Sequence, residues 1–242
     1  MLTASLFGNI CKRSQSISCA NLVKTILYGR SLDNIKSIQY GRDHEQVAKR
    51  QLCIQENIVV DDCGLFIDDI FPFLGATPDG LVNDSTILEI KCPISASGML
   101  FEEAIAKKKI TFWKQDKKNN FFFTNTNHNW YYQVQGQLHI SNKTVCIFAV
   151  WLGEAIPLKI ELIKRDDKFW GEKMESRLST FFMDCLLPEI IDSRFKRSMP
   201  IRDPQYIMSA LEKKRKAATL IRTEKIKKCK KNLLRDIETN VN

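Results

Sequence analysis

Asp79, Glu89 and Lys91 are ionisable residues at a spacing that could bring their side chains together. Residues 86–91 alternate and are rich in apolar and β-favouring types, which predicts a strand, and Asn83-Asp84-Ser85 before them is typical of a turn. A hairpin with this three-residue loop pairs residue 82 with 86, 81 with 87 and 80 with 88. Asp79 is therefore expected to lie opposite Glu89.

Two carboxylates at opposed positions of a hairpin need a neutralising partner. Their Cβ atoms would lie ~5 Å apart, where like charges destabilise a sheet. A divalent cation would remove the repulsion, and carboxylate, carbonyl and water oxygens suit magnesium or manganese rather than zinc. Because side chains alternate along a strand, Lys91 should project on the face of Glu89, while Ile90 turns into the core and offers only its carbonyl.

These residues resemble a known nuclease motif. Pro78-Asp79 and Glu89-Ile90-Lys91 match the PD-(D/E)xK core, and the longer runs 76–81 and 89–93 are similar to the lambda-exonuclease branch, the YqaJ-like viral recombinase domain. The resemblance covers about residues 2–200. It implies that Asp79 and Glu89 hold one or two Mg²⁺ (or Mn²⁺) ions, that the Ile90 carbonyl completes one site, and that Lys91 activates the attacking water. An ordinary hairpin with a paired surface Lys and Glu is the alternative.

Two further candidates come from the same resemblance. Gly41 to Glu45 fits the family's Gly-x-x-x-Glu on a helix predicted over 40–52, which makes Glu45 a third acid that supports the second metal ion. The Gln-Val-Gln at 133–135 matches a family tripeptide whose first Gln, here Gln133, lies near the catalytic Lys. A solvated helix acid and a buried structural Gln remain the alternatives.

The start of the sequence carries a candidate DNA contact. Thr3-Ala4-Ser5 matches a family segment in which an upstream Arg and the Ser bind the 5′-phosphate of a DNA end. No residue in this sequence stands at the position of that Arg, so Ser5 is carried over alone. We expect either that end recognition is weakened or that the sequence is truncated at its start. A helix N-cap is the alternative role of Ser5.

Composition narrows the class of protein. The 242 residues are 44% hydrophobic, with 10 Gly and 7 Pro, and their formal charge of +9 favours a polyanion such as DNA. The eight cysteines are scattered without a CxxC, as in reduced intracellular proteins. No signal peptide and no run of ~18 apolar residues is found, so we expect a nuclear or cytoplasmic protein that is neither secreted nor membrane-bound.

The predicted fold class is α/β, a mixed central β-sheet flanked by helices, with a basic helical C-terminal tail. We expect a nuclease domain over 1–200 and a tail over 201–242, with a linker marked by Pro200 and Pro204. The segments over 58–74 are expected to supply the sheet that holds the hairpin, with their Asp residues solvated. Other predicted elements are helices over 19–28, 129–140, 169–187 and 205–235, and strands over 145–151 and 158–163.

Two lysine-rich stretches are ambiguous. Lysines between 107 and 118 are interleaved with Phe112, Trp113 and the run 121–123; they could contact phosphates and bases, or could surround a few core aromatics. The lysine runs after residue 212 could contact DNA, could be a nuclear address, or could simply be solvated.

The predicted function is a metal-dependent DNA nuclease, a 5′→3′ exonuclease acting on linear double-stranded DNA. Two alternatives stay open, a DNA-binding module of the same fold that has lost the enzyme and a restriction-type endonuclease. The resemblance also implies a trimeric ring as a possible homo-oligomer, although no feature of the sequence indicates that assembly.

Overall fold

The computed structural model describes the backbone of residues 1–29, 35–116 and 121–239, and the side chains of these segments as far as Lys225. The chain forms two compact units, which we describe separately. The first unit comprises Met1–Lys12 and Arg30–Phe182, and the second comprises Arg13–Gly29 and Met183–Asn242.

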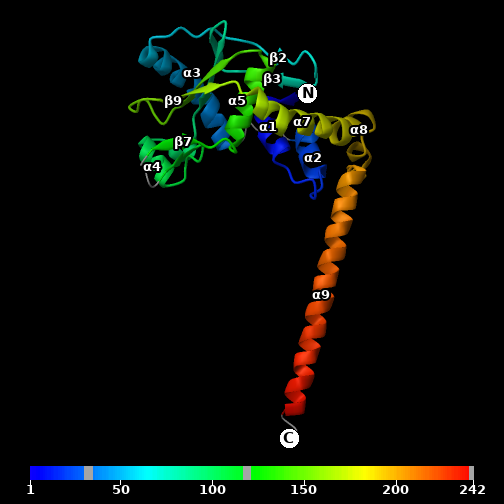
Figure 1. Cartoon of the computed structure of the whole chain (residues 1–242). Coiled ribbons are helices and arrows are strands. Elements are labelled where there is room, and N and C mark those ends of the chain that lie inside the picture. Colours follow the sequence, from blue (N-terminus) through cyan, green and yellow to red (C-terminus); the bar gives the residue numbers. More distant parts are fainter. Residues whose placement is uncertain (30–34, 117–120, 240–242) are drawn as a thin grey trace. The chain divides into compact units, whose positions relative to one another are not determined.

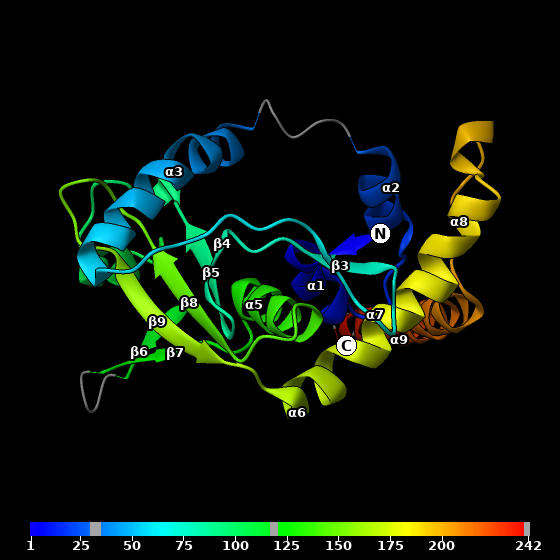
Figure 2. The same ribbon diagram turned by 90° about the horizontal axis from the view of Figure 1, so that it is seen from above.

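A four-stranded mixed sheet is the centre of the first unit (Figures 1 and 2). Its order is β4 (Gly80–Asn83), β5 (Thr86–Lys91), β8 (Val145–Val150) and β9 (Lys159–Lys164). β5 and β8 are parallel, and the other neighbours are antiparallel. The predicted α/β class with a mixed central sheet is confirmed.

Helices cover both faces of this sheet, because alternate residues of each strand are apolar on opposite sides. On one face, Ala48 and Leu52 of α3 (Lys36–Glu56) pack with Leu88 and Ile90 of β5. On the other face, α5 (Asn129–Ile140) packs against the strands. The residues of that second cluster include Ile87, Val134, Leu138, Cys146, Phe148 and Val150.

The hairpin register is as predicted next to the candidate site and differs at the turn. Gly80 pairs with Leu88 and Leu81 with Ile87, but Asn83, rather than residue 82, pairs with Thr86. The Asn83 Oδ1 accepts bonds from the Ser85 N–H and hydroxyl, at 2.9 and 3.0 Å, which tightens the loop to two residues. A bulge at residue 82 absorbs the extra residue and preserves the register beside Asp79.

The prediction that residues 58–74 supply the sheet holding the hairpin is wrong. β2 (Phe66–Ile67) and β3 (Leu74–Ala76) form a separate three-stranded sheet with β1 (Leu2–Thr3), and β8 supports the hairpin. The stretch 58–60 contains no strand, and only Asp61 pairs with Leu81 in an isolated bridge.

Asp68, expected to be solvated, is instead buried, with only 5% of its surface exposed. Its carboxylate accepts the main-chain N–H groups of Ile70 and Phe71, at 3.0 and 2.7 Å. These bonds satisfy the buried charge and fix the turn that leads into β3.

The remaining elements of the first unit include a hairpin that we did not predict, β6 (Trp113–Gln115) with β7 (Phe122–Thr124). Lys117 and Lys118, part of the ambiguous lysine stretch, lie outside the described residues.

The helix predicted over 169–187 is a succession of α-helical and π-helical turns. The other elements are α1 (Ala4–Cys11), η2 (Ile94–Ala96), α4 (Phe101–Ala106), α6 (Asp167–Phe169), η3 (Trp170–Glu175), α7 (Ser176–Thr180) and η4 (Phe181–Leu186), the last of which runs on into the second unit.

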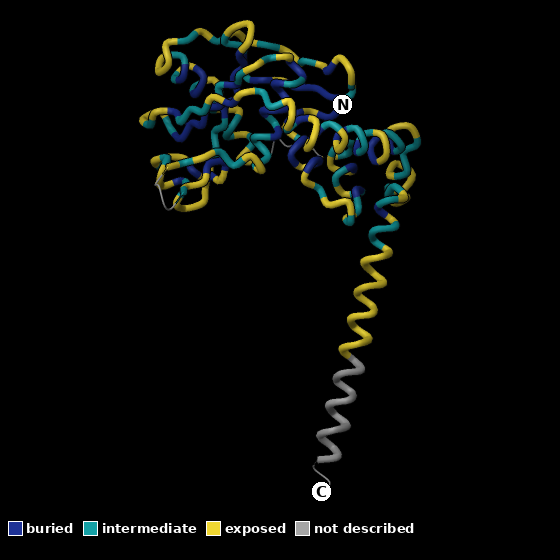
Figure 3. Tube along the Cα trace, viewed as in Figure 1, coloured by how far each residue is buried: buried dark blue, intermediate teal, exposed yellow. Residues whose placement is uncertain are grey.

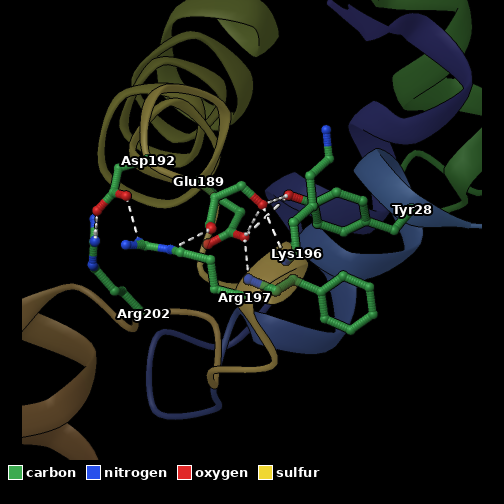
Figure 4. Close-up of polar contacts among 8 residues, drawn as sticks. Tyr28, Glu189, Asp192, Lys196, Arg197 and Arg202 are labelled. Atoms are coloured by element: carbon green, nitrogen blue, oxygen red, sulfur yellow. Dashed lines mark hydrogen bonds and ion pairs between the residues drawn. The ribbon is translucent and has the colours of Figure 1, made fainter.

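The second unit contains α2 (Ala20–Tyr28), α8 (Leu187–Ile191), η5 (Phe195–Arg197) and the predicted tail helix α9 (Gln205–Thr239). Glu189 is buried there and accepts the Tyr28 hydroxyl at 3.1 Å and the Phe195 N–H at 2.9 Å (Figure 4). Burial opposes ionisation, but these and neighbouring donors lower the pKa of Glu189. Asp192 pairs with both Arg197 and Arg202.

Residues 212–225 of α9 are exposed along its whole circumference (Figure 3). Within the described residues, no helix combines the length and apolar character needed to cross a bilayer.

Candidate active site

β5 presents Glu89 and Lys91 on the face covered by α5. Glu89 is 1% exposed, and Ile90 between them turns toward the α3 face, as predicted. Lys91 donates to the Glu89 Oε1 in an ion pair. The strand's alternation therefore brings the expected acid and base into contact.

Two glutamines of α5 complete the surroundings of Glu89. Gln133 Nε2 donates to Oε1 and Gln137 Nε2 donates to Oε2, each at 2.6 Å. Both oxygens of the buried carboxylate are thus satisfied. Sequence reasoning identified Gln133 but missed Gln137, although the spacing of four residues on a predicted helix puts both on one face. Gln135 bonds the Lys164 carbonyl and the Asp166 N–H instead.

Asp79 precedes β4 and is held to β5 by two bonds. Its N–H donates to the Leu88 carbonyl at 2.9 Å, and its Oδ2 accepts the Ile90 N–H at 2.6 Å. Burial, followed by the charges of Glu89 and Glu45, raises the pKa of Asp79 to about 8, against the opposing effects of Lys91 and the Ile90 N–H. The carboxyl group therefore lies where its ionised form lacks sufficient counter-charge.

Glu45 reaches the same place from α3. Burial and the charge of Glu89 raise its pKa, while Lys91 and Lys49 oppose the rise. Three acids and Lys91 thus line one pocket of about 530 Å³. Its other lining residues include Ser37, Ile38, Gly41, Arg42, Ile90, Cys92, Pro93, Trp130 and Gln133.

Lys91 is a cation in this pocket. Burial alone would lower its pKa, but the charges of Glu89 and Asp79 and its bond to Glu89 raise the pKa overall. The side chain is therefore a proton-bearing ammonium, able to donate hydrogen bonds and to stabilise negative charge, rather than a free base at neutral pH.

Lys49 is a second lysine of the site, and sequence reasoning missed it. It lies one helical turn after Glu45 and is 7% exposed. Its ammonium donates to the Asp79 carbonyl at 2.9 Å and to Asp62 Oδ1 at 2.7 Å. Lys49 therefore ties the helix that carries Glu45 to the main chain of Asp79.

Close packing at Gly80 explains why a glycine follows Asp79. A Cβ atom there would lie 2.4 Å from Val60 Cγ1 and 3.0 Å from the Asp61 carbonyl oxygen. Any side chain would force the start of β4 away from residues 60–61 and disturb the position of Asp79.

The oxygen atoms of this pocket fit a hard divalent cation. Asp79, Glu89 and Glu45 bring carboxylate oxygens to the pocket, which Ile90 also lines, and burial together with the charge of Glu89 raises the pKa values of Asp79 and Glu45. Nowhere in the described segments do three or more His, Cys, Asp or Glu side chains meet as a ready-made metal cluster. Any such ion would therefore depend on the main-chain carbonyl and water as well as on carboxylates.

Ser5 is placed apart from these residues. It lies in the first turn of α1, is exposed, and its Oγ is 3.2 Å from Thr3 Oγ1. It is not among the residues that line the pocket. The alternative role of Ser5 as a helix N-cap is wrong, because Thr3 occupies that position.

The mixed sheet, the PD and ExK residues on its hairpin, and the helices on both faces define an α/β core of the PD-(D/E)xK type. The YqaJ-like viral recombinase domain matches residues 1–144, and the chain belongs to this family. Comparison with curated proteins finds no match.

Solved structures share the fold. An alkaline exonuclease from Laribacter hongkongensis has a TM-score of 0.57 and 23% identity, covering 81% of this chain and 93% of its own. The same enzyme in complex with dAMP gives the same values. A phage-related exonuclease from Haemophilus somnus 129PT has a TM-score of 0.50 and 14% identity, covering 74% of this chain and 90% of its own. At identities this low, the structural likeness shows a common fold.

Proposed function

We propose that the chain is a metal-dependent DNA nuclease, a 5′→3′ exonuclease acting on linear double-stranded DNA. The observation that carries the proposal is the convergence of Asp79, Glu89 and Lys91 on one pocket, with Glu45 beside them. Family membership and the shared fold of two exonucleases support it.

Asp79, Glu89 and the Ile90 carbonyl would hold Mg²⁺ or Mn²⁺, with Glu45 supporting a second ion. Such an ion supplies Lewis-acid stabilisation of the phosphate charge and a more acidic bound water. Lys91 keeps its proton, orients the attacking water and stabilises negative charge on the phosphate. Gln133 and Gln137 hold Glu89 in one orientation, so that little reorganisation is needed during the reaction.

Degradation of linear and circular duplexes tests the proposal. We expect the chain to degrade the linear duplex with Mg²⁺, to lose activity in EDTA, and to leave a covalently closed circle intact. Loss of label from 5′-labelled ends before 3′-labelled ends would establish the direction. Cleavage of the circle would instead indicate an endonuclease, and DNA binding without cleavage would indicate a module that has lost the enzyme.

Single-residue variants test whether these acids form the active site. Asp79→Ala and Glu89→Ala should each abolish cleavage while circular dichroism shows a folded chain. The matched control is Asp84→Ala, because Asp84 is an exposed acid in the turn of the same hairpin. Full magnesium-dependent activity of Asp79→Ala would refute the assignment.

Three expectations from the sequence stay predictions. Ser5→Ala should reduce any preference for 5′-phosphorylated over 5′-hydroxyl ends. Sedimentation would test the trimeric ring. Removal of 201–242 would test whether the nuclease domain ends near residue 200.

A further inference from the structure

A second pocket of the first unit, of about 440 Å³, is rich in positive charge. Lys12 follows α1, and Lys173 and Arg177 come from the helical turns after Asp167. The remaining described lining residues are Cys11, Thr126, Asn127, Tyr132 and Phe169, so none of the residues that the structure describes adds a carboxylate to the wall.

Two of these cations are held by the main chain rather than by acids. Lys12 Nζ donates to the Asn127 carbonyl at 3.0 Å, and Arg177 Nη1 donates to the Cys11 carbonyl at 2.8 Å. A carbonyl orients a cation without neutralising it. An ammonium has three N–H donors and a guanidinium five, so each side chain keeps further donors for a ligand.

Tyr132 adds a neutral donor to the pocket. The residue is 6% exposed, and its ring packs edge-on against Phe169 with centroids 5.0 Å apart. Across the segments that the structure describes, no protein group accepts a hydrogen bond from its hydroxyl. Burial raises the pKa of Tyr132, so the phenol stays protonated and can donate.

We propose that this pocket binds a phosphate group of the nucleic-acid substrate, away from the reacting centre. Phosphate oxygens accept the bonds that Lys12, Lys173, Arg177 and the Tyr132 hydroxyl offer. Lys12 and Arg177 are held by main-chain carbonyls, which leave their positive charge available to an anion. The inference rests on the proposed function only in taking DNA as the substrate.

Helix α5 links this pocket to the candidate active site. Tyr132 lines the second pocket, and the next residue, Gln133, donates to Glu89. A phosphate bound at Tyr132 would therefore be fixed to the same helix that orients the Glu89 carboxylate. This contact would set the register of the DNA strand relative to the reacting phosphate.

Binding of a fluorescent duplex in EDTA, where cleavage is prevented, tests the pocket. Tyr132→Phe keeps the buried ring and the net charge, and should weaken binding about 2- to 10-fold through the lost hydroxyl. Lys173→Gln should reduce the slope of log K against log salt by about 0.9, the amount for one phosphate contact. The control is Lys168→Gln, whose side chain is 82% exposed and lies outside the pocket.

The source of the phosphate is resolved by using 5′-phosphorylated and 5′-hydroxyl duplexes. An effect of Tyr132→Phe on both duplexes indicates an internal phosphodiester, and an effect on the first alone indicates the terminal phosphate. Either result supports the proposal. It is overturned if Tyr132→Phe and Lys173→Gln both bind like Lys168→Gln, or if the wild-type chain does not bind the duplex.

Cleavage of the same duplexes by the wild-type chain with Mg²⁺ separates this inference from the proposed function. Cleavage together with unchanged binding by the pocket variants would refute the pocket alone. Weakened binding by those variants without any wild-type cleavage would refute the nuclease alone.

Discussion

Replacing Asp79 by Asn should stabilise the metal-free chain while abolishing cleavage. Asn can still accept the Ile90 N–H bond, but it removes one of three acids that share a partly buried pocket. The folded-state pKa of Asp79 is raised from 3.8 to about 8, so the unfolded chain loses this proton first as the pH rises. The contribution of Asp79 to wild-type stability should therefore fall between about pH 4 and pH 8.

The size of the effect follows from that shift. Each pKa unit corresponds to about 1.4 kcal/mol, which sets a ceiling of roughly 5 kcal/mol at pH 8. The pocket is open to water, which relaxes around the charge, so we expect a gain of about 1–3 kcal/mol. In a chain of this size, each kcal/mol raises the melting temperature by about 2–4 °C.

Thermal unfolding in EDTA at pH 5 and pH 8 measures the difference. Asp79→Asn should melt at a higher temperature than wild type at pH 8 and at nearly the same temperature at pH 5. Mg²⁺ should stabilise wild type more than the variant, because the variant lacks a carboxylate proposed to hold the ion and a ligand stabilises only the state that binds it. Asp84→Asn, in the exposed turn, should change neither result. A lower melting temperature of Asp79→Asn in EDTA at pH 8 would refute the reasoning.

Three further predictions concern groups around the site. Lys91→Met should lose turnover yet keep magnesium binding by calorimetry, because the ammonium contacts Glu89 rather than an ion; loss of metal binding would contradict this. Lys49→Met should lower kcat more than it changes duplex affinity, and Lys49→Arg should retain more of the wild-type kcat than Lys49→Met. Equal kcat values for both variants and wild type would exclude a positioning role for Lys49. Burial and Lys12 lower the pKa of His128 to about 4, so stability should fall as the pH drops from ~6.5 toward 4. His128→Asn, which can still cap α5 through the Trp130 N–H, should reduce that loss in acid unfolding, and an unchanged loss would refute the role of His128.

Local sequence pattern explains some of the elements that could be predicted. β5 and α5 both have the predicted bounds; alternation and the preceding turn account for β5, whereas α5 buries residues around most of its circumference and has no narrow apolar stripe. β2 and β3 contain two and three residues, too few for a period to show, so their pairing with β1 was not predictable. The bulge at residue 82 depends on one side chain, Asn83, that bonds back to the turn.

The residues of the candidate site likewise divide into those that the sequence could place and those that it could not. Asp79, Glu89 and Lys91 belong to one hairpin, so local alternation was sufficient to bring them together. The bonds of Gln137 to Glu89 and of Lys49 to Asp79 join segments 48 and 30 residues apart. Such contacts follow from packing of α5 and α3 on the sheet. Local spacing puts Gln137 on the same helix face as Gln133, but it does not say which strand residue that face meets.

The parallel pairing of β5 with β8 has a consequence for the order of folding. The β4–β5 hairpin is local, and hairpins form in about 1–10 μs. Pairing of Thr86 with Val145 must wait until a long loop closes and α5 is in place, which is slower because of the entropy lost. A nascent chain ending before residue 129 thus contains the whole acidic motif without Gln133, Gln137 or β8. Until α5 docks, the Glu89 carboxylate remains in water, without the two amide groups that orient it in the folded chain.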